Sequence, residues 1–152
     1  MATFKSDIKT AAAQVAISDQ IINNSRTGAR VLYAYPVYTL AGTEAANDVI
    51  KLFDLPAGAE IVPELSSVTC SADPGTTLTL NVGDAADTDR YAAGIVLSAG
   101  GQVAFTNTAI PAAVGTKYLP TAETEISAIV ASANTLTAAV KLCFAIAYRI
   151  LG

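Results

Sequence analysis

Apolar and polar residues alternate with a period of two along most of the chain after residue 30, which is the spacing of β-strands and not of helices. The stretch VLYAYPVYTL, residues 31–40, shows the alternation clearly. It places two apolar sets on opposite faces: Val31, Tyr33, Tyr35 and Val37 on one, and Leu32, Ala34, Tyr38 and Leu40 on the other. Because both faces need cover, we expect this strand to be central in a sandwich or to be buried by another subunit.

Further strand-like stretches follow, separated by turn signals, at residues 48–55, 60–72, 76–82, 91–98, 102–107, 125–132 and 136–150. Between two of them, Asp73, Pro74 and Gly75 occupy positions that suit a type II turn. About eight strands at short spacing predict an all-β protein, an antiparallel jelly-roll β-sandwich. An immunoglobulin-like sandwich is the alternative, although the sequence contains no Trp.

Residues 1–29 do not follow the strand period. Ile8, Ala11 and Val15 recur at helical spacing, but the polar residues of NNSRTG end that pattern. We therefore expect an N-terminal arm over residues 1–29, with room for one short helix, and a single jelly-roll domain over residues 30–152.

The composition is unusually apolar for one small domain. Hydrophobic residues make up 52% of the chain and charged residues 14%, whereas charged residues are about a quarter of an ordinary soluble domain. A membrane or a partner subunit could cover the excess. The sequence has no run of about 20 apolar residues and no signal peptide, so we expect no membrane partner and synthesis in a cytoplasm. A second copy of the chain is the favoured partner, in a dimer or trimer.

Charge divides the chain into a basic beginning and an acidic remainder. The first 30 residues have a net charge of +2, whereas the whole chain has −4, so the remainder has −6. The basic side chains of the beginning are Lys5, Lys9, Arg26 and Arg30. An acidic body repels phosphates, and we therefore expect no nucleic-acid partner.

The segment VGDAADTDRY brings Asp84, Asp87 and Asp89 close together in sequence and is the strongest candidate for a metal site. It fails the EF-hand template, because neither register places Gly at the sixth position and Glu at the twelfth. An irregular calcium site remains an alternative. We favour a polar turn in which the aspartates bond to their own backbone and Arg90 supplies a countercharge.

Catalytic arrangements are scarce in this sequence. The chain contains no His, which excludes the Ser/His/Asp and Cys/His arrangements. The pairs Glu123 with Glu125 and Asp87 with Asp89 could serve a glycosidase in principle, but adjacent acids of this kind are typical of a solvated surface. Cys70 and Cys143 have no metal-ligand spacing, and we interpret both as small buried residues. We expect no enzyme activity, no cofactor and no resident metal.

The order of segments resembles a family of small virion structural proteins of tailed bacteriophages. The segments DVIKLFDLPAGAEI, VGDAADTDRY and LTAAVKLCFAIAYR carry the resemblance, which covers roughly residues 28–150. It implies a jelly-roll protein of the phage head, of the decoration or cement type. Such a protein oligomerises and bridges neighbouring major capsid subunits on the capsid exterior after assembly in the host bacterial cytoplasm.

These considerations define two sets of candidate contact residues. Lys5, Lys9, Arg26 and Arg30 of the arm are candidates for docking to the major capsid protein. Candidates for contact between copies are Val31, Tyr33, Tyr35, Val37, Ala145 and Ala147. Two other functions remain open: a jelly-roll module on a virion that binds carbohydrate or a receptor, and a head-fibre or connector role.

Overall fold

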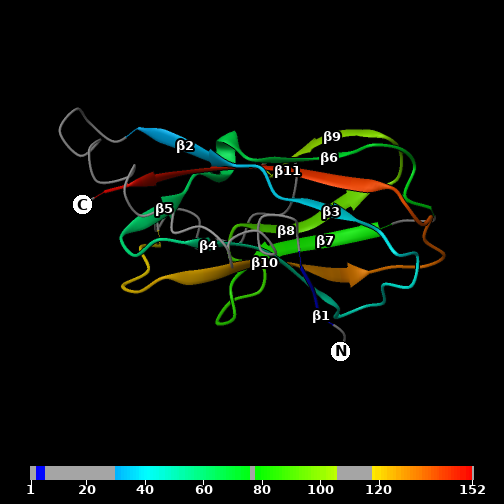
Figure 1. Cartoon of the computed structure of the whole chain (residues 1–152), viewed down its shortest axis with the longest axis horizontal. Helices are drawn as coiled ribbons and strands as arrows, with labels where there is room; N and C mark the ends of the chain where they lie inside the picture. Colours follow the sequence, from blue (N-terminus) through cyan, green and yellow to red (C-terminus); the bar gives the residue numbers. More distant parts are fainter. Residues whose placement is uncertain (1–2, 6–29, 76–77, 106–117, 152) are drawn as a thin grey trace.

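Two β-sheets pack face to face and make the protein an all-β sandwich, as the alternation of apolar residues predicts (Figure 1). The computed structural model describes residues 3–5, 30–75, 78–105 and 118–151. Within these ranges there is no helix long and apolar enough to cross a membrane.

The five-stranded sheet contains, in spatial order, β1 (Thr3–Lys5), β4 (Val49–Leu55), β10 (Thr124–Ser132), β7 (Leu78–Gly83) and β8 (Ala92–Leu97). The main path of the six-stranded sheet is β2 (Val31–Ala34), β11 (Lys141–Ile150), β6 (Ser67–Cys70) and β9 (Gly101–Ala104). Two short strands, β3 (Val37–Thr39) and β5 (Ala59–Ile61), also pair with β11. A 3-10 turn, η2 (Pro63–Leu65), separates β5 from β6.

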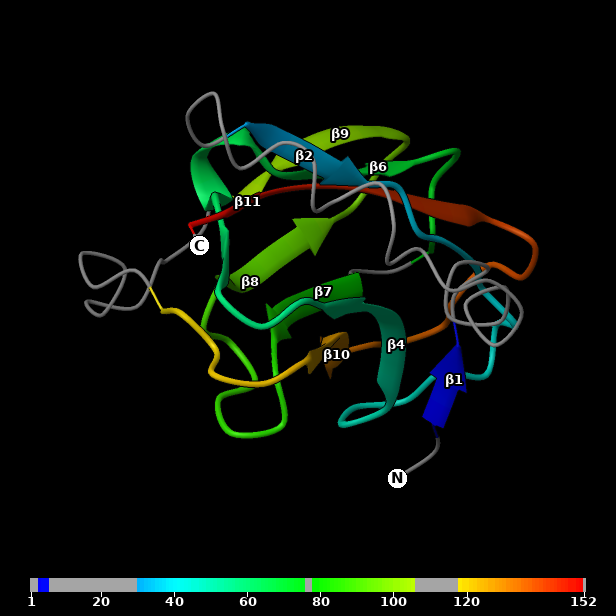
Figure 2. The ribbon, with the colours of Figure 1, turned by 60° about the vertical axis from the view of Figure 1, so that its left-hand side comes forward.

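The strands occupy eight positions in a nested order. Counted along the chain, the positions are β2 with β3, β4, β5 with β6, β7, β8, β9, β10 and β11. The first position pairs with the eighth, the second with the seventh, the third with the sixth and the fourth with the fifth. This is the strand order of a jelly roll, and Figure 2 shows the two layers that it forms.

Prolines divide two of the expected strands. The strand expected over residues 31–40 is interrupted at Pro36, which has no N–H, but its carbonyl accepts a hydrogen bond from Phe144 N at 3.0 Å. β2 and β3 therefore follow the same edge of β11. The strand expected over residues 60–72 is interrupted by η2, which begins at Pro63. The hydroxyl of Ser66 spans this break, because it donates to Val62 O at 2.8 Å and accepts from Ala147 N at 3.0 Å.

The final strand is shorter than its apolar pattern predicts. It begins at Lys141 and not at residue 136, because Ala139 has a left-handed φ of 64° that interrupts the extended backbone. From Lys141 onward the expected alternation holds. Gly75 has a φ of 105°, which fits its place in the expected turn, and its N–H donates to Asp73 Oδ1 at 2.9 Å.

The core lies between the sheets and receives apolar side chains from both. β11 contributes Leu142, Phe144 and Ile146, each at most 1% exposed. The facing sheet contributes fully buried side chains from its four antiparallel strands, including Ile50, Leu52, Leu78, Leu80, Val82, Ile95, Ile126 and Val130. Buried residues alternate with less buried ones from Leu78 to Val82 and from Lys141 to Ile146, which is the period of two expected for strands in these stretches.

The N-terminal residues Thr3–Lys5 belong to the sandwich and not to a separate arm. They form β1, which pairs in parallel with the outer edge of β4, with Thr3 opposite Val49 and Lys5 opposite Lys51. Figure 2 shows β1, in dark blue, at the end of the five-stranded sheet. The arm expected over residues 1–29 thus includes three residues that pair with the sandwich. The short helix considered for the arm lies outside the described residues.

Replacing Phe144 by Ala should destabilise the fold by about 3–5 kcal/mol, because it leaves a cavity in the core beneath β11 of the six-stranded sheet. Val96→Ala, in β8, is the matched control: this side chain is 49% exposed, and its loss should change the free energy of unfolding by about 0.5 kcal/mol or less. Urea unfolding of both variants measures the difference. Equal effects would contradict the assignment of Phe144 to the core.

Candidate functional site

The candidate interface residues converge on the outer face of the six-stranded sheet. Residues directly opposite one another on paired strands share a face. Tyr33 of β2 is opposite Ala147, and Val37 of β3 is opposite Cys143. Because the intervening residues of β11 fill the core, these pairs lie on the side of the sheet that faces away from the sandwich. Residues selected from two distant parts of the sequence thus come together on one surface.

The exposed part of this surface is aromatic and aliphatic. Val31 is 41% exposed, Tyr33 43% and Tyr35 61%, and the two tyrosine rings stack with their centroids 5.8 Å apart. Ala145 is half-buried at the centre of the face. Ala147 is fully buried by its own chain, so this candidate offers no side-chain surface to a second subunit. We call the exposed and half-buried members of this set the tyrosine face: Val31, Tyr33, Tyr35, Val37 and Ala145.

One apolar residue beside this face escaped the sequence analysis. Leu65 of η2 is 50% exposed, and η2 lies beside β11 because Val62 N donates to Ala147 O at 2.8 Å. In Figure 1, η2 is the short green coiled ribbon near β11. Apolar side chains therefore border β11 on both sides, Tyr33 from β2 and Leu65 from η2. The alternation of residues 60–72 could not indicate Leu65, because η2 breaks the period of two.

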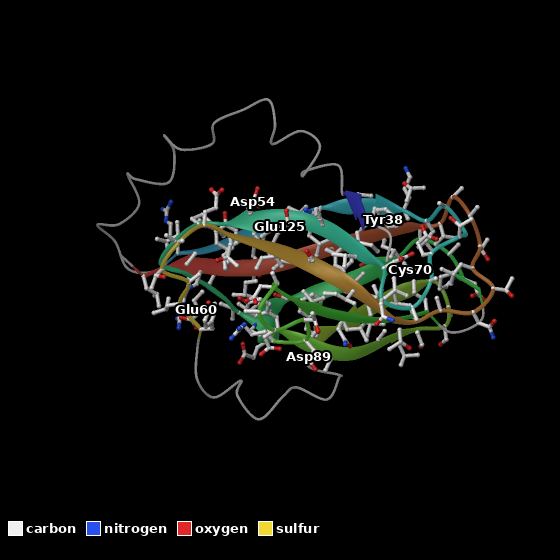
Figure 3. All side chains as sticks on the ribbon, turned by 90° about the horizontal axis from the view of Figure 1, so that it is seen from below. Tyr38, Asp54, Glu60, Cys70, Asp89 and Glu125 are labelled. Carbon is white, nitrogen blue, oxygen red and sulfur yellow. The ribbon has the colours of Figure 1, made fainter. Side chains whose placement is uncertain are left out.

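A buried ion pair stabilises one end of the same sheet. Glu60 of β5 is 1% exposed and lies directly opposite Arg149 of β11. The Arg149 guanidinium donates to both carboxylate oxygens at 3.3 Å, which neutralises the buried charge. Figure 3 shows Glu60 toward the end of the sandwich opposite to Tyr38 and Cys70. The ion pair holds β5 on β11. Arg149 thereby compensates the charge of the buried Glu60 carboxylate.

The four basic docking candidates are not brought together by the described structure. Lys5 lies in β1, at the edge of the five-stranded sheet. Arg30 is exposed and directly precedes β2 of the other sheet. Lys9 and Arg26 lie outside the described residues.

The three aspartates of the acidic loop have different surroundings. Asp84 is 3% exposed, and its carboxylate accepts hydrogen bonds from the N–H groups of Ala86 and Asp87 at 2.9 and 3.0 Å. Arg90 Nε donates to its second oxygen at 2.8 Å. Gly83 is needed at the preceding position, because a Cβ there would collide with the Asp87 carbonyl oxygen. This geometry is the polar turn that we favoured, with Arg90 as the countercharge.

Asp87 and Asp89 remain on the outside of the loop. A hydrogen bond between their carboxyl groups raises the pKa of Asp89 above its ordinary value. The Asp84 carboxylate already accepts hydrogen bonds from Arg90 and from two backbone N–H groups. Across the described ranges, no group of three or more His, Cys, Asp or Glu side chains is arranged to hold a metal ion.

Arg90 also connects the acidic loop to the segment that precedes β10. Its guanidinium carbon lies 3.9 Å from the centre of the Tyr118 ring, a cation–π contact. The neighbouring Tyr91 is 4% exposed, and burial raises the pKa of its phenol. Among the described residues its hydroxyl has no hydrogen-bond partner. Arg90 thus holds two loops of the five-stranded sheet together.

At the start of β4, a buried carboxylate organises the loop over residues 40–48. Glu44 is 5% exposed and accepts hydrogen bonds from the Tyr38 hydroxyl at 2.7 Å and from the N–H groups of Ala41 and Gly42 at 2.6 and 2.9 Å. Burial alone would raise the pKa of Glu44, but these hydrogen bonds lower it below its ordinary value of 4.5. The cluster fixes the approach of the chain from one sheet to the other.

The remaining candidates from the sequence are the acids Glu123 and Glu125 and the cysteines Cys70 and Cys143. Glu125 of β10 pairs with Lys51 of β4 at 3.0 Å, and Figure 3 shows Glu125 near Asp54 on the same sheet. Glu123 is exposed and directly precedes β10. Both cysteines are free thiols; Cys70 is buried, and that burial raises its pKa. The half-buried Cys143 lies on the outer face of β11.

Comparisons with solved structures identify this fold in capsids of bacteriophages. A chain in the capsid of Ralstonia phage GP4 superposes with a TM-score of 0.60 at 20% sequence identity, over 99% of both chains. A chain in the cyanophage Pam1 capsid asymmetric unit gives 0.53 at 24% identity, over 91% of this chain and 95% of that one. One in the acidic stable capsid structure of Helicobacter pylori bacteriophage KHP30 gives 0.52 at 21%, over 80% and 89%. No protein-family model and no curated protein matches the sequence.

Replacing Asp84 by Asn should lower the free energy of unfolding by about 1–3 kcal/mol, because it removes the charge that Arg90 pairs with in a buried setting. Asp87→Asn and Asp89→Asn should each change it by about 0.5 kcal/mol or less, since both groups lie at the surface. The three aspartates are thus not equivalent. A melting temperature that rises with calcium, and does so less in the Asn variants, would instead support a metal site.

Replacing Glu44 by Gln should destabilise the protein by about 1–3 kcal/mol at neutral pH, because the variant loses charged hydrogen bonds to Tyr38 and two amides. The pKa of Glu44 is lower in the folded protein, so its contribution is present above the ordinary value of 4.5 and is lost as the pH falls further. Unfolding measured from pH 7 downward should show the two proteins converging below that value. A constant difference would contradict this role.

Proposed function

We propose that this chain is a virion structural protein of a tailed bacteriophage, a decoration protein that associates with itself and with the major capsid protein on the capsid exterior. The observation that carries the proposal is the fold, which matches chains in three phage capsid structures over 80–99% of this chain. The resemblance of residues 48–61, 82–91 and 136–149 to that class of protein agrees with it.

The tyrosine face supports the self-association in this proposal. Its three most exposed side chains, Val31, Tyr33 and Tyr35, lie on one side of an otherwise regular sheet. Tyrosines contribute large contact area at low conformational cost and are enriched at interfaces between proteins. Contact between copies through this face also accounts for an apolar fraction of 52%, because a dimer or trimer covers surface that one domain leaves exposed.

The basic beginning of the chain supplies the proposed contact to the capsid. Lys9, Arg26 and Arg30 have the charge opposite to that of the acidic body, and repeated sites on a capsid lattice add many weak contacts together. Charge reversal at Arg26 and Arg30 should weaken attachment in a manner that depends on salt, since exposed charges are screened. Catalysis has no part in this proposal.

Replacing Tyr33 and Tyr35 together by Ser should shift the purified protein toward monomer and weaken its attachment to capsids about tenfold or more. The physical reason is that a buried aromatic residue at an interface is worth about 1–3 kcal/mol or more, and each 1.4 kcal/mol is a factor of about ten. Val96→Ser, an equally exposed apolar position in the five-stranded sheet, is the control and should change neither. Light scattering at high micromolar concentration and sedimentation with isolated capsids provide the two measurements.

Light scattering, glycan binding and cryo-EM together separate the proposal from its alternatives. A wild-type protein that is monomeric at these concentrations would contradict self-association through the tyrosine face. Binding to a glycan array that the Tyr33 and Tyr35 variant loses, without any attachment to capsids, would instead support a carbohydrate-binding module on the virion. A cryo-EM map that places the chain in a fibre or connector would assign it to those structures.

A further inference from the structure

The edge of β4 is an acceptor for one additional strand. On one side, the first half of β4 pairs with β10, with Ile50 opposite Ala128 and Val49 opposite Ile129. On the other side, the same residues pair with β1, where Phe4 is opposite Ile50. β1 is the terminal strand of the sheet order, and its pairing is the one parallel pairing among the described strands. The edge of β4 is thus occupied by only three residues of chain.

The sandwich does not depend on β1 for its completeness. The eight nested strand positions are all filled without it, and Ile50 and Leu52 of β4 are fully buried between the sheets. β10 holds β4 along its whole length, from Thr124 opposite Leu55 to Ile129 opposite Val49. Terminal strands with few partners open at low free-energy cost, so β1 can leave its edge while the jelly roll stays folded.

The connection from β1 to the rest of the chain is long. Residues 6–30 join β1, in the five-stranded sheet, to β2, in the six-stranded sheet. A segment of about 25 residues spans up to about 80 Å when fully extended. Its length in sequence therefore does not restrict β1 to the β4 edge of its own chain.

We propose that β1 is an exchangeable strand: residues Thr3–Lys5 of one copy add to the β4 edge of a second copy and link the two chains. The acceptor is the backbone edge of residues 49–51, and the occupant is the same segment that fills it within one chain, so both modes form the same hydrogen bonds. Exchange of an identical element is a low-cost route to association, and strand addition to a sheet edge obtains its affinity from the backbone.

The balance between the two modes depends on concentration. A tether of about 25 residues gives the chain's own strand an effective concentration on the order of millimolar. Dilute protein should therefore keep β1 on its own β4. If copies lie side by side on a particle, which rests on the proposed function, neighbouring strands compete on equal terms and exchange connects the copies.

Cysteine pairs in register test the exchange in purified protein without any capsid. Lys5→Cys and Lys51→Cys are made in separate chains that carry Cys143→Ala, so that the buried Cys70 is the one native thiol that remains. The two variants are mixed from about ten micromolar to about one millimolar, a range whose upper end reaches the effective concentration, and are oxidised mildly. Non-reducing electrophoresis should show a disulfide-linked heterodimer that increases with concentration, since opposite residues of paired strands lie within disulfide reach.

The matched control is Lys5→Cys mixed with Lys141→Cys, an exposed lysine in β11 of the other sheet. Heterodimer from the in-register pair should exceed this control about tenfold or more at the highest concentration. A chain carrying both Lys5→Cys and Lys51→Cys should close within itself when dilute, which verifies the register. If either variant fails to fold by circular dichroism, Thr3→Cys with Val49→Cys replaces the pair. Closure within one chain at every concentration, or a heterodimer yield equal to the control, would overturn the proposal.

Discussion

The pairing of β11 with four other segments is the constraint on which the rest of the structure depends. This one strand of ten residues holds β2 and β3 along one side and β5 and β6 along the other. Its inward side chains form the centre of the core, and its outward side chains form the middle of the tyrosine face. Since neighbouring strands are interrupted at Pro36 and Pro63, continuity of the six-stranded sheet comes from β11 and not from its neighbours.

Buried carboxylates determine how the loops leave this framework. Glu44 holds the passage from β3 to β4, Asp84 holds the turn after β7, and Glu60 holds β5 against β11. Each is compensated by a hydroxyl, amide or guanidinium donor within 3.3 Å, which a buried carboxylate requires. A chain with few charged residues thus uses several of its acids inside the protein, where they specify loop geometry and are not available as a catalytic pair.

The outer surface of the sandwich is divided between two kinds of contact. The tyrosine face offers side-chain area, and the β4 edge offers backbone groups. Contacts of the first kind depend on aromatic burial, whereas contacts of the second kind depend on hydrogen bonds that any short strand can form. A protein that uses both can join copies in two directions.

The period-two alternation by itself determined the all-β class and which residues of 31–40 share a face, because side-chain direction in a strand follows from sequence position. The hydrogen-bonding residues of the acidic turn were also recognisable, since aspartates after a glycine bond locally. Only the tertiary structure decided which strands are neighbours, that Ala139 ends the last strand early, that Ala147 is covered by its own chain and that Asp84 alone of the three aspartates is buried. It alone placed Leu65 and Tyr33 on opposite sides of β11 and residues 3–5 on β4. These are contacts between residues far apart in sequence, and no local pattern records them, because strand pairing depends on backbone groups that every residue carries.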